Sequence, residues 1–308
     1  MSLDALYMAQ QNGATESNRK LAQLTRDFIE ANLDNNAQAE MNGIEQTTRQ
    51  LYYGLLQARE NVEVCRESAE IEKELLEIAQ QKHSLGMLSD LGLSQQEYSL
   101  TSAESKLSQA EQAVLSTQNR FNMLMNLPLD TQLDLTTPLE KLEAELPTLE
   151  EAIDSMMNNS LKLKQIDFGI EAAEIQYKSL RYTTSTSSST YKKAETAYQN
   201  AVTGLSQAKS SMKTDMQTAY FELADLENQI ASFESTIALT EKSLGVQETQ
   251  LALGMTTVSD VNQTKLKLQQ AKQGLTNAIV TYNTALTDFN FSMGIGTERL
   301  SFSSEKSE

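Results

Sequence analysis

The chain has 308 residues and a net charge of −17, from 25 Lys and Arg against 42 Asp and Glu. This negative charge argues against nucleic acid as a partner and against a general attraction to anionic lipid. Only 39% of the residues are apolar and 6% are aromatic, with 12 Gly, 3 Pro and no Trp, so long helices joined by narrow apolar seams are expected. The chain has a single cysteine, Cys65, so it cannot form an internal disulfide. Its only histidine is His83, and these two residues supply neither a metal site nor a nucleophile with its base. We therefore predict no enzyme activity, no metal and no cofactor.

The first part of the chain predicts two helices. A short amphipathic helix is expected over residues 3–11, and Asn12-Gly13 is a turn signal that ends it. A second helix is expected over residues 17–33, with its large apolar side chains on one face. Residues 34–41 begin with Asp-Asn-Asn and are expected to form a loop.

A first long helical hairpin follows. A helix is predicted over residues 40–84, in which a line of residues seven apart indicates coiled-coil packing. The residues on this line are Leu55, Val62, Ala69, Leu76 and His83. The chain reverses around Gly86, and a return helix is predicted over residues 94–126, with Ser94 and Glu97 as a capping box.

A connector separates the two halves of the chain. All three prolines lie in residues 128–147, which a helix cannot cross without a kink or an end. Thr148 and Glu151 then form a capping-box pattern at the start of a short helix, and another helix is predicted over residues 161–180. The Ser/Thr-rich stretch 182–191 is expected to be a loop or a small hairpin, because these side chains compete with helix by bonding to their own backbone.

A second long hairpin repeats the first at an offset of 168 residues, which separates Gly86 from Gly254 and Phe121 from Phe289. Its first helix is predicted over residues 192–253, and its return helix begins beyond the glycine. The predicted fold is therefore all-α, with two-fold repeated long antiparallel helical hairpins and little or no β structure. The expected domains are a first repeat (1–127), the connector (128–147), a second repeat (148–299) and a disordered tail (300–308).

The two hairpin tips are a predicted docking surface for a partner protein. In each tip a glycine allows a tight reversal that presents Leu and Met to solvent. The tip residues are Leu85, Gly86, Met87, Leu253, Gly254 and Met255. His83, beside the first tip, is predicted to pack or to cap the helix, with a pH-sensitive contact as the alternative. Cys65 is predicted to be plain core.

Asp260, at the mouth of the second hairpin, admits two interpretations. Thr257 and Asp260 form a capping box, and an acid at the start of a helix also suits the helix dipole, so the carboxylate can serve as a cap alone. Alternatively, several chains arranged in a ring would bring equivalent carboxylates together at an entrance.

The chain resembles the TolC family of outer-membrane efflux and secretion channels in the order of its elements. Each half has a short helix, a medium helix, a very long helix, a Gly-centred tip and a return helix with a heptad seam. Residues 253–261, LGMTTVSDV, are similar to the family's second tip motif, and residues 148–158 resemble its start-of-repeat helix. The resemblance implies a homotrimer whose hairpins close into a hollow twelve-helix α-barrel. It also implies that the tips meet a membrane-fusion adaptor, which links the conduit to an inner-membrane pump, ABC or proton-driven, for the export of small molecules or proteins.

The resemblance also assigns positions at the entrance. Asp260 matches the first of two family aspartates that narrow it, and Gln263 stands at the second. In the family, a tyrosine and an arginine hold the entrance closed. This chain has Leu251 and Thr256 at the matching positions, so a weaker gate is expected.

The chain departs from the family in one larger respect. Family members carry two β-strands in each repeat, and a strand that spans a bilayer needs about 9–11 residues. The corresponding inserts here, residues 34–41 and 182–191, are too short for such hairpins, so a member that lacks the β-barrel strands is expected. The expected location is the cell envelope, on the extracytoplasmic side, with no signal peptide in this sequence. The alternative is a coiled-coil structural or adaptor protein of the envelope that forms no pore.

Overall fold

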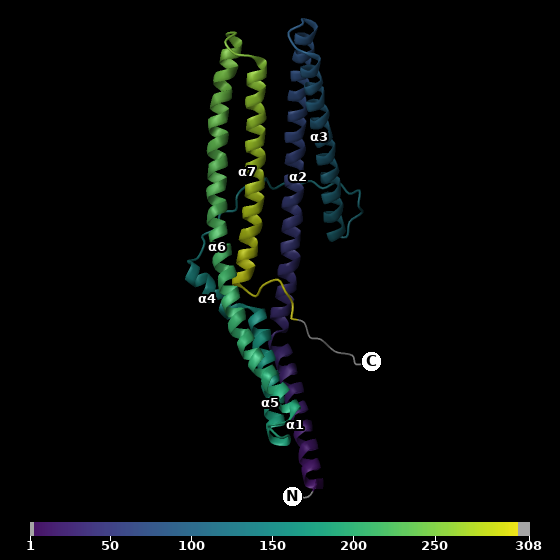
Figure 1. Ribbon diagram of the computed structural model, residues 1–308, viewed down its shortest axis with the longest axis vertical. Coiled ribbons are helices and arrows are strands. Elements are labelled where there is room, and N and C mark those ends of the chain that lie inside the picture. The colour runs from purple at the N-terminus through teal and green to yellow at the C-terminus, as the bar shows by residue number, and fades with distance from the viewer. Residues whose placement is uncertain (1–2, 301–308) are drawn as a thin grey trace. The chain divides into compact units, whose positions relative to one another are not determined.

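The computed structural model describes residues 3–300, and the side chains of residues 16–300. This part of the chain is all-α, with seven helices and no strand, which confirms the predicted fold class (Figure 1). In chain order the helices are α1 (Leu3–Ala31), α2 (Leu33–Ser84), α3 (Asp90–Leu124), α4 (Leu149–Asn159), α5 (Leu161–Thr183), α6 (Ser189–Ala252) and α7 (Val258–Met293). Within the same residues, no helix combines the length and the apolarity that a bilayer span requires.

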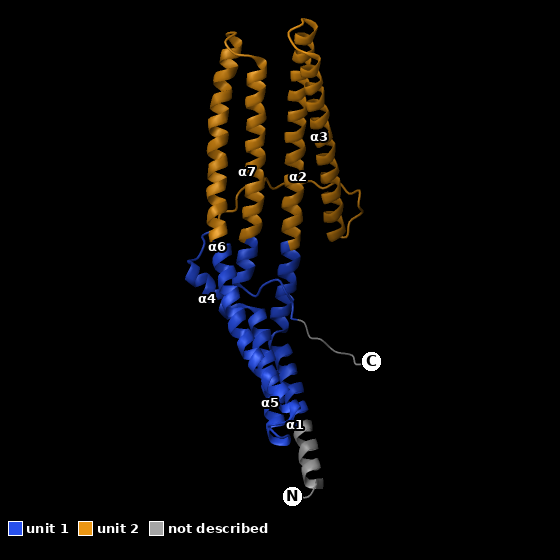
Figure 2. Cartoon of the chain, viewed as in Figure 1, with its two compact units in different colours: residues 1–46, 145–220, 287–308 blue, residues 47–144, 221–286 orange. Residues whose placement is uncertain are grey.

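The chain divides into two compact units, which Figure 2 colours separately. Unit 1 comprises Met1–Gln46, Glu145–Tyr220 and Thr287–Glu308, and unit 2 comprises Thr47–Ala144 and Phe221–Leu286. This division cuts across the two sequence repeats, because each unit contains part of both. The long helices α2, α6 and α7 each contribute one portion to each unit.

Unit 1 is built around the packing of α1 on α5. The rings of Phe28 and Phe168 stack with their centroids 4.6 Å apart. The buried members of the adjoining apolar cluster are Ala39, Leu161 and Leu300. The N–H of Leu300 donates to Asn36 Oδ1 (2.7 Å), so this first residue of the predicted tail is part of the core, whereas residues 301–308 lie outside the described part.

The break between the first two helices lies at Asn32, earlier than predicted. Its side-chain amide donates to Phe28 O at the end of α1 (3.0 Å), and its carbonyl oxygen accepts from Asn36 N at the start of α2 (2.9 Å). One residue thus satisfies backbone groups at both helix ends. The prediction of a loop over residues 34–41 is wrong, because this segment forms the first turns of α2 and buries Ala39 in the core of unit 1.

Two other local signals do not decide the structure. Asn12-Gly13 does not interrupt α1, since one glycine inside a helix costs only about 1 kcal/mol. Ser94 is not the N-cap of the return helix, because α3 begins one turn earlier. Its N-cap is Ser89, whose Oγ accepts from Gly92 N (3.2 Å).

The predicted loop between the medium and the long helix of the second repeat is present but shorter. Only residues 184–188 separate α5 from α6, instead of the whole stretch 182–191. Ser188 Oγ accepts from Tyr191 N (3.1 Å), so a hydroxyl of this stretch helps to start α6.

Unit 2 contains two antiparallel hairpins, α2–α3 and α6–α7, with α7 beside α2 (Figure 2). The members of both predicted seams are buried or half-buried. Leu55 and Leu223, which the offset of 168 relates, are fully buried, and truncating either to alanine is expected to cost about 2–5 kcal/mol. Tyr52 packs on Phe121 with ring centroids 6.4 Å apart. The repeated antiparallel hairpins predicted from the heptads are thus confirmed.

Candidate functional site

The two hairpin tips have the same backbone geometry. Gly86 and Gly254 both have a φ of 71°, in the left-handed region where an L side chain is strained. In the first tip the N–H of Gly86 donates to His83 O (2.9 Å). The N–H of Met87 donates to Lys82 O (2.8 Å), and the two bonds together form a Schellman C-cap. The second tip repeats both bonds at the same distances.

The tips present apolar side chains to solvent. Leu85 and Met87 are each 73% exposed, and Leu253 and Met255 are 69% and 72% exposed. Large apolar side chains held outward by a rigid turn are typical of a protein-binding surface. The six predicted tip residues therefore form two matching apolar surfaces in unit 2.

Asp260 caps the N-terminus of α7. Its carboxylate accepts from Thr257 Oγ1 (2.6 Å) and Thr257 N (3.1 Å), and its N–H donates to Thr257 Oγ1 (3.2 Å), which is the capping-box pattern. The bonds from Thr257, and a further one from Thr256 Oγ1, hold the pKa of Asp260 below its usual value, and the charge of Lys82 adds to this effect. Gln263 lies one turn further along α7 and is exposed. The capping geometry is present, and a role at an entrance stays a proposal.

Removing the carboxylate tests the cap. We expect Asp260→Ala to lower the melting temperature, because the hydrogen bonds from Thr257 lose their acceptor. Asp260→Asn should lower it less, since an amide oxygen can still accept them. Thermal unfolding followed by circular dichroism measures both variants. Equal melting temperatures for the wild type and Asp260→Ala would mean that the cap contributes nothing to stability.

His83 contacts an acidic side chain across the first tip. Its Nε2 lies 2.7 Å from Asp90 Oδ1, so the contact joins the end of α2 to the start of α3 across the first tip. The side chain of His83 is half-buried, with 36% of its surface exposed, so packing at this position is partial. The equivalent positions of the second tip are Leu251 and Val258, which cannot ionise.

A row of amide and carboxylate side chains joins α2 to α7, and the sequence analysis missed it. Asn262, only 1% exposed, donates to Glu74 Oε2 (3.1 Å), and Gln269 donates to a carboxylate oxygen of Glu67. Two further pairs, Gln57–Asn277 and Gln273–Asn61, continue the row. Polar contacts thus hold the two hairpins of unit 2 together, whereas apolar seams hold each hairpin. The available signal was that Asn262 and Gln269 are seven residues apart, one position after the seam.

The connector is bound along its length by side chains of α3, α2 and α7. Asn122, fully buried near the end of α3, donates from Nδ2 to the carbonyl oxygens of Leu129 (3.0 Å) and Thr131 (2.9 Å). Later parts of the connector are held by Arg59 at Leu133 O, by Tyr52 at Thr137, and by Asn283 at Glu140 O and Leu142 N. These side chains supply the hydrogen-bond partners that a non-helical backbone lacks. The prolines identify the connector, but they do not reveal this binding.

An ionic cluster fixes the end of the connector. Lys141 Nζ lies 2.7 Å from Glu227 Oε1 of α6 and 5.1 Å from the ring centroid of Tyr282 of α7. The hydroxyl of the buried Tyr282 donates to the same carboxylate (3.1 Å). The hydrogen bond from Lys141 holds the pKa of Glu227 below its usual value. Burial, and then the bond to Glu227, raise the pKa of Tyr282 to about 12.

Acid is expected to weaken this cluster. Because the folded-state pKa of Glu227 is lowered, its stabilising contribution is present above the unfolded-state pKa, about 4.3, and is lost as the pH falls through the folded-state value. Glu227→Gln should lose this contribution at every pH. The difference in urea-unfolding midpoint between wild type and variant is therefore expected to be largest near neutral pH and to shrink below about pH 4. An unchanged difference would exclude an ionic role for Glu227.

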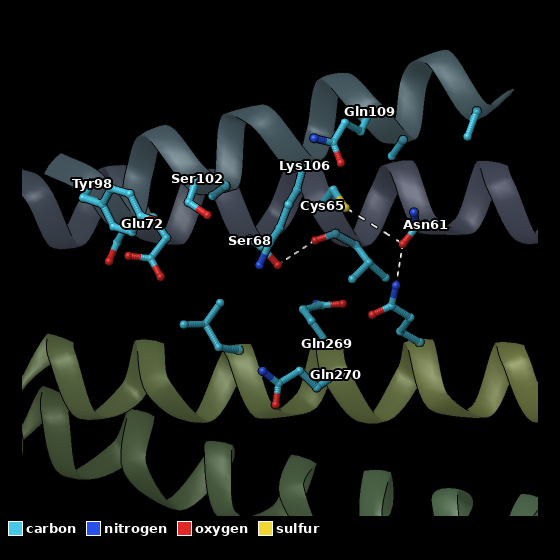
Figure 3. Close-up of a pocket in the computed structure, with 17 residues that line it drawn as sticks. Asn61, Cys65, Ser68, Glu72, Tyr98, Ser102, Lys106, Gln109, Gln269 and Gln270 are labelled. Carbon is cyan, nitrogen blue, oxygen red and sulfur yellow. Dashed lines mark hydrogen bonds between the residues drawn. The ribbon is translucent and has the colours of Figure 1, made fainter. Parts of the chain in front are cut away.

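A groove of about 670 Å³, lined by both polar and apolar side chains, runs between α2, α3 and α7 (Figure 3). The two repeats differ here. Cys65 and Lys106 line the groove in the first hairpin, and the equivalent positions of the second hairpin, 168 residues later, are Phe233 and Gly274. In the second hairpin the Phe233 ring packs on Gly274, where a Cβ would not fit. Cys65 is half-buried beside the groove rather than plain core, because no such ring fills this space, and burial raises the pKa of its thiol. The other labelled lining residues are Asn61, Ser68, Glu72, Tyr98, Ser102, Gln109, Gln269 and Gln270.

The fold is similar to that of solved bacterial membrane proteins, whereas the sequence itself finds no match. No family model matches the sequence, and no curated protein matches it significantly. The outer membrane protein VceC of Vibrio cholerae has a TM-score of 0.63 at 14% identity, over 86% of this chain and 75% of that chain. CusC has a TM-score of 0.66 at 12% identity, over 93% and 74%. The open state of the MtrE outer membrane channel of Neisseria gonorrhoeae has a TM-score of 0.58 at 14% identity, over 89% and 72%.

The all-α fold of repeated hairpins that the resemblance implied is therefore confirmed by its likeness to these solved structures. The likeness covers both repeated hairpins, because 86–93% of this chain is matched. The TM-scores show a shared fold, and sequence identities of 12–14% carry no information about a shared substrate.

Proposed function

We propose that the chain is one subunit of a homotrimeric, TolC-like conduit of the cell envelope. It would work with a membrane-fusion adaptor and an inner-membrane pump, ABC or proton-driven, to export small molecules or proteins. The observation that carries the proposal is the likeness of fold to outer-membrane channels over 86–93% of the chain. The role is to form a passage, not to catalyse a reaction.

Apolar rows on the two outer helices of unit 2 support a closed ring. The portions of α6 and α3 lie at opposite edges of the four helices (Figure 2). Leu239 and Val246 of α6, and Leu253 just beyond its end, are seven residues apart and more than half exposed. On α3, Leu91 and Tyr98 are also seven apart and largely exposed. Because both rows begin at a tip, the α3 edge of one copy can meet the α6 edge of the next in a head-to-tail contact, and ring closure leaves no free edge.

A ring of this kind also gives the predicted site residues a shared place. The tips of all copies would lie at one end and supply the adaptor-docking surface. Asp260 and Gln263 would border the entrance there, with one carboxylate from each copy. Like charges brought together in this way repel one another and favour cations.

The state of assembly tests the proposal directly. Light scattering of the purified protein at micromolar concentration is expected to give three times the 34.2 kDa of one chain. Negative-stain electron microscopy is expected to show rings with a central hole in end-on views. A stable, fully helical monomer, or a filled bundle without a hole, would contradict the conduit and favour a coiled-coil structural or adaptor protein.

A further inference from the structure

One surface of unit 1 has a charge opposite to that of the whole chain. Residues 16–20 and 174–195, from α1, the end of α5 and the start of α6, carry six Lys and Arg against three Glu. The local charge of this basic end is +3 in a chain of −17. Its cations are Arg19, Lys20, Lys178, Arg181, Lys192 and Lys193. Because charges in about 0.1 M salt are screened beyond about 10 Å, a partner that approaches the basic end meets its local charge and not the net charge.

Aromatic contacts hold the segments of the basic end together. The hydroxyls of Tyr177 in α5 and Tyr191 in α6 lie 3.0 Å apart. The ring of Tyr177 also stacks on that of Tyr198, with centroids 5.7 Å apart. Residues 16–20 of α1 complete the surface, since Glu16, Ser17 and Lys20 line a hollow with the last turns of α5. The cations are therefore carried on packed helices.

Four of the cations, Arg19, Arg181, Lys192 and Lys193, face solvent without an acidic partner among the described residues. The ion pairs of this region are Lys20–Glu16 (2.8 Å) and Lys178–Glu174 (2.9 Å). Arg181, Lys192 and Lys193 are exposed, and none of them has a carboxylate within 4.0 Å in the part of the chain that the structure describes. Beside them, the side chain of Tyr182 is 87% exposed. A free tyrosine ring thus lies among unpaired cations.

We propose that the basic end docks on the surface of a bilayer that contains anionic phospholipids. The charges are complementary, and each Lys or Arg near an anionic leaflet strengthens binding by about fivefold. An exposed tyrosine suits the headgroup level, where one side of its ring is apolar and its hydroxyl is hydrated. The hydroxyls of residues 184–188 can donate hydrogen bonds to phosphate oxygens. This contact is peripheral, and it does not depend on the proposed conduit.

Flotation with vesicles tests this docking surface. The full chain is mixed with phosphatidylcholine vesicles, with and without phosphatidylglycerol, in about 0.1 M and about 1 M salt. We expect flotation only with the anionic vesicles and only at the lower salt. The triple variant Arg181→Gln, Lys192→Gln and Lys193→Gln is expected to lower the partition coefficient about a hundredfold, because three contributions of about fivefold are lost.

A matched variant separates the basic end from net charge. Lys209→Gln, Lys213→Gln and Lys242→Gln remove the same charge from exposed positions elsewhere on α6, and this variant is expected to float like the wild type. Equal loss of flotation in the two triple variants would overturn the proposal. No flotation with anionic vesicles, or equal flotation with neutral ones, would overturn it as well. Light scattering of each variant shows whether assembly is retained, so a failure of the conduit and a failure of lipid docking are read separately.

Discussion

The double variant Leu239→Glu and Val246→Glu is expected to be a monomer. In the proposed ring these side chains lie in the contact between α6 of one copy and α3 of the next. A glutamate there would lose its hydration without gaining a cationic partner, which costs several kcal/mol at each of the contacts. Helicity is expected to stay unchanged, because the two side chains are 70% and 57% exposed in the single chain. Light scattering and circular dichroism measure the two effects.

A second double variant on the same helix is the control. Glu241→Gln and Glu248→Gln are also seven residues apart and exposed, but they lie two positions further on, which turns them to the opposite face of α6. This variant is expected to remain a trimer. If the glutamates at positions 239 and 246 left the mass at three subunits, the contact between copies would have to lie elsewhere, and the α3–α6 ring would be wrong.

Gly86→Pro and Gly254→Pro, each made singly, are expected to abolish export while helical content stays nearly intact. Proline fixes φ near −65°, whereas Gly86 and Gly254 have a φ of 71°, so neither Schellman turn can form. The Leu and Met side chains of the tips would then no longer present one surface to an adaptor. Accumulation of ethidium in host cells whose own copy is deleted measures export, and circular dichroism of the purified variants measures helicity.

Alanine at the same glycines is the matched control. No atom lies within 4 Å of a Cβ added at Gly86 or Gly254, so the change introduces no clash. It introduces only the strain of the left-handed conformation, about 1–2 kcal/mol for each residue. We expect export to be reduced but retained. Normal export in both proline variants would show that the tips do not dock the partner.

The helical hairpins and their tips could be predicted because their signals are local. A line of apolar residues seven apart specifies a helix and its buried face together, and a glycine between two such lines specifies the reversal. The Thr148–Glu151 capping box, confirmed in the structure, needs partners only three residues apart. The Thr257–Asp260 pair follows the same rule.

The position of the first helix break could not be predicted from local signals. Three asparagines, Asn32, Asn35 and Asn36, stand close together and have similar preferences for helix ends. The break falls at Asn32, because the packing of unit 1 buries Ala39 and places Asn36 against the N–H of Leu300. Contact with a residue more than 250 positions away thus extends α2 to Leu33.

By itself, the sequence determined the all-α class, the doubled hairpins, the tips and the proline-containing connector, since each depends on residues within a few turns of one another. Only the tertiary structure decided which polar side chains leave water. Glu74 and Gln269 have the composition of a solvated helix flank, and they meet amide or carboxylate partners only because α2 and α7 lie side by side. The basic end arises in part in the same way, when packing brings the cations of α1 to those of residues 174–195, about 160 positions later in the chain. A polar side chain stays in water unless folding supplies a partner, and that partner lies in a distant segment of the chain.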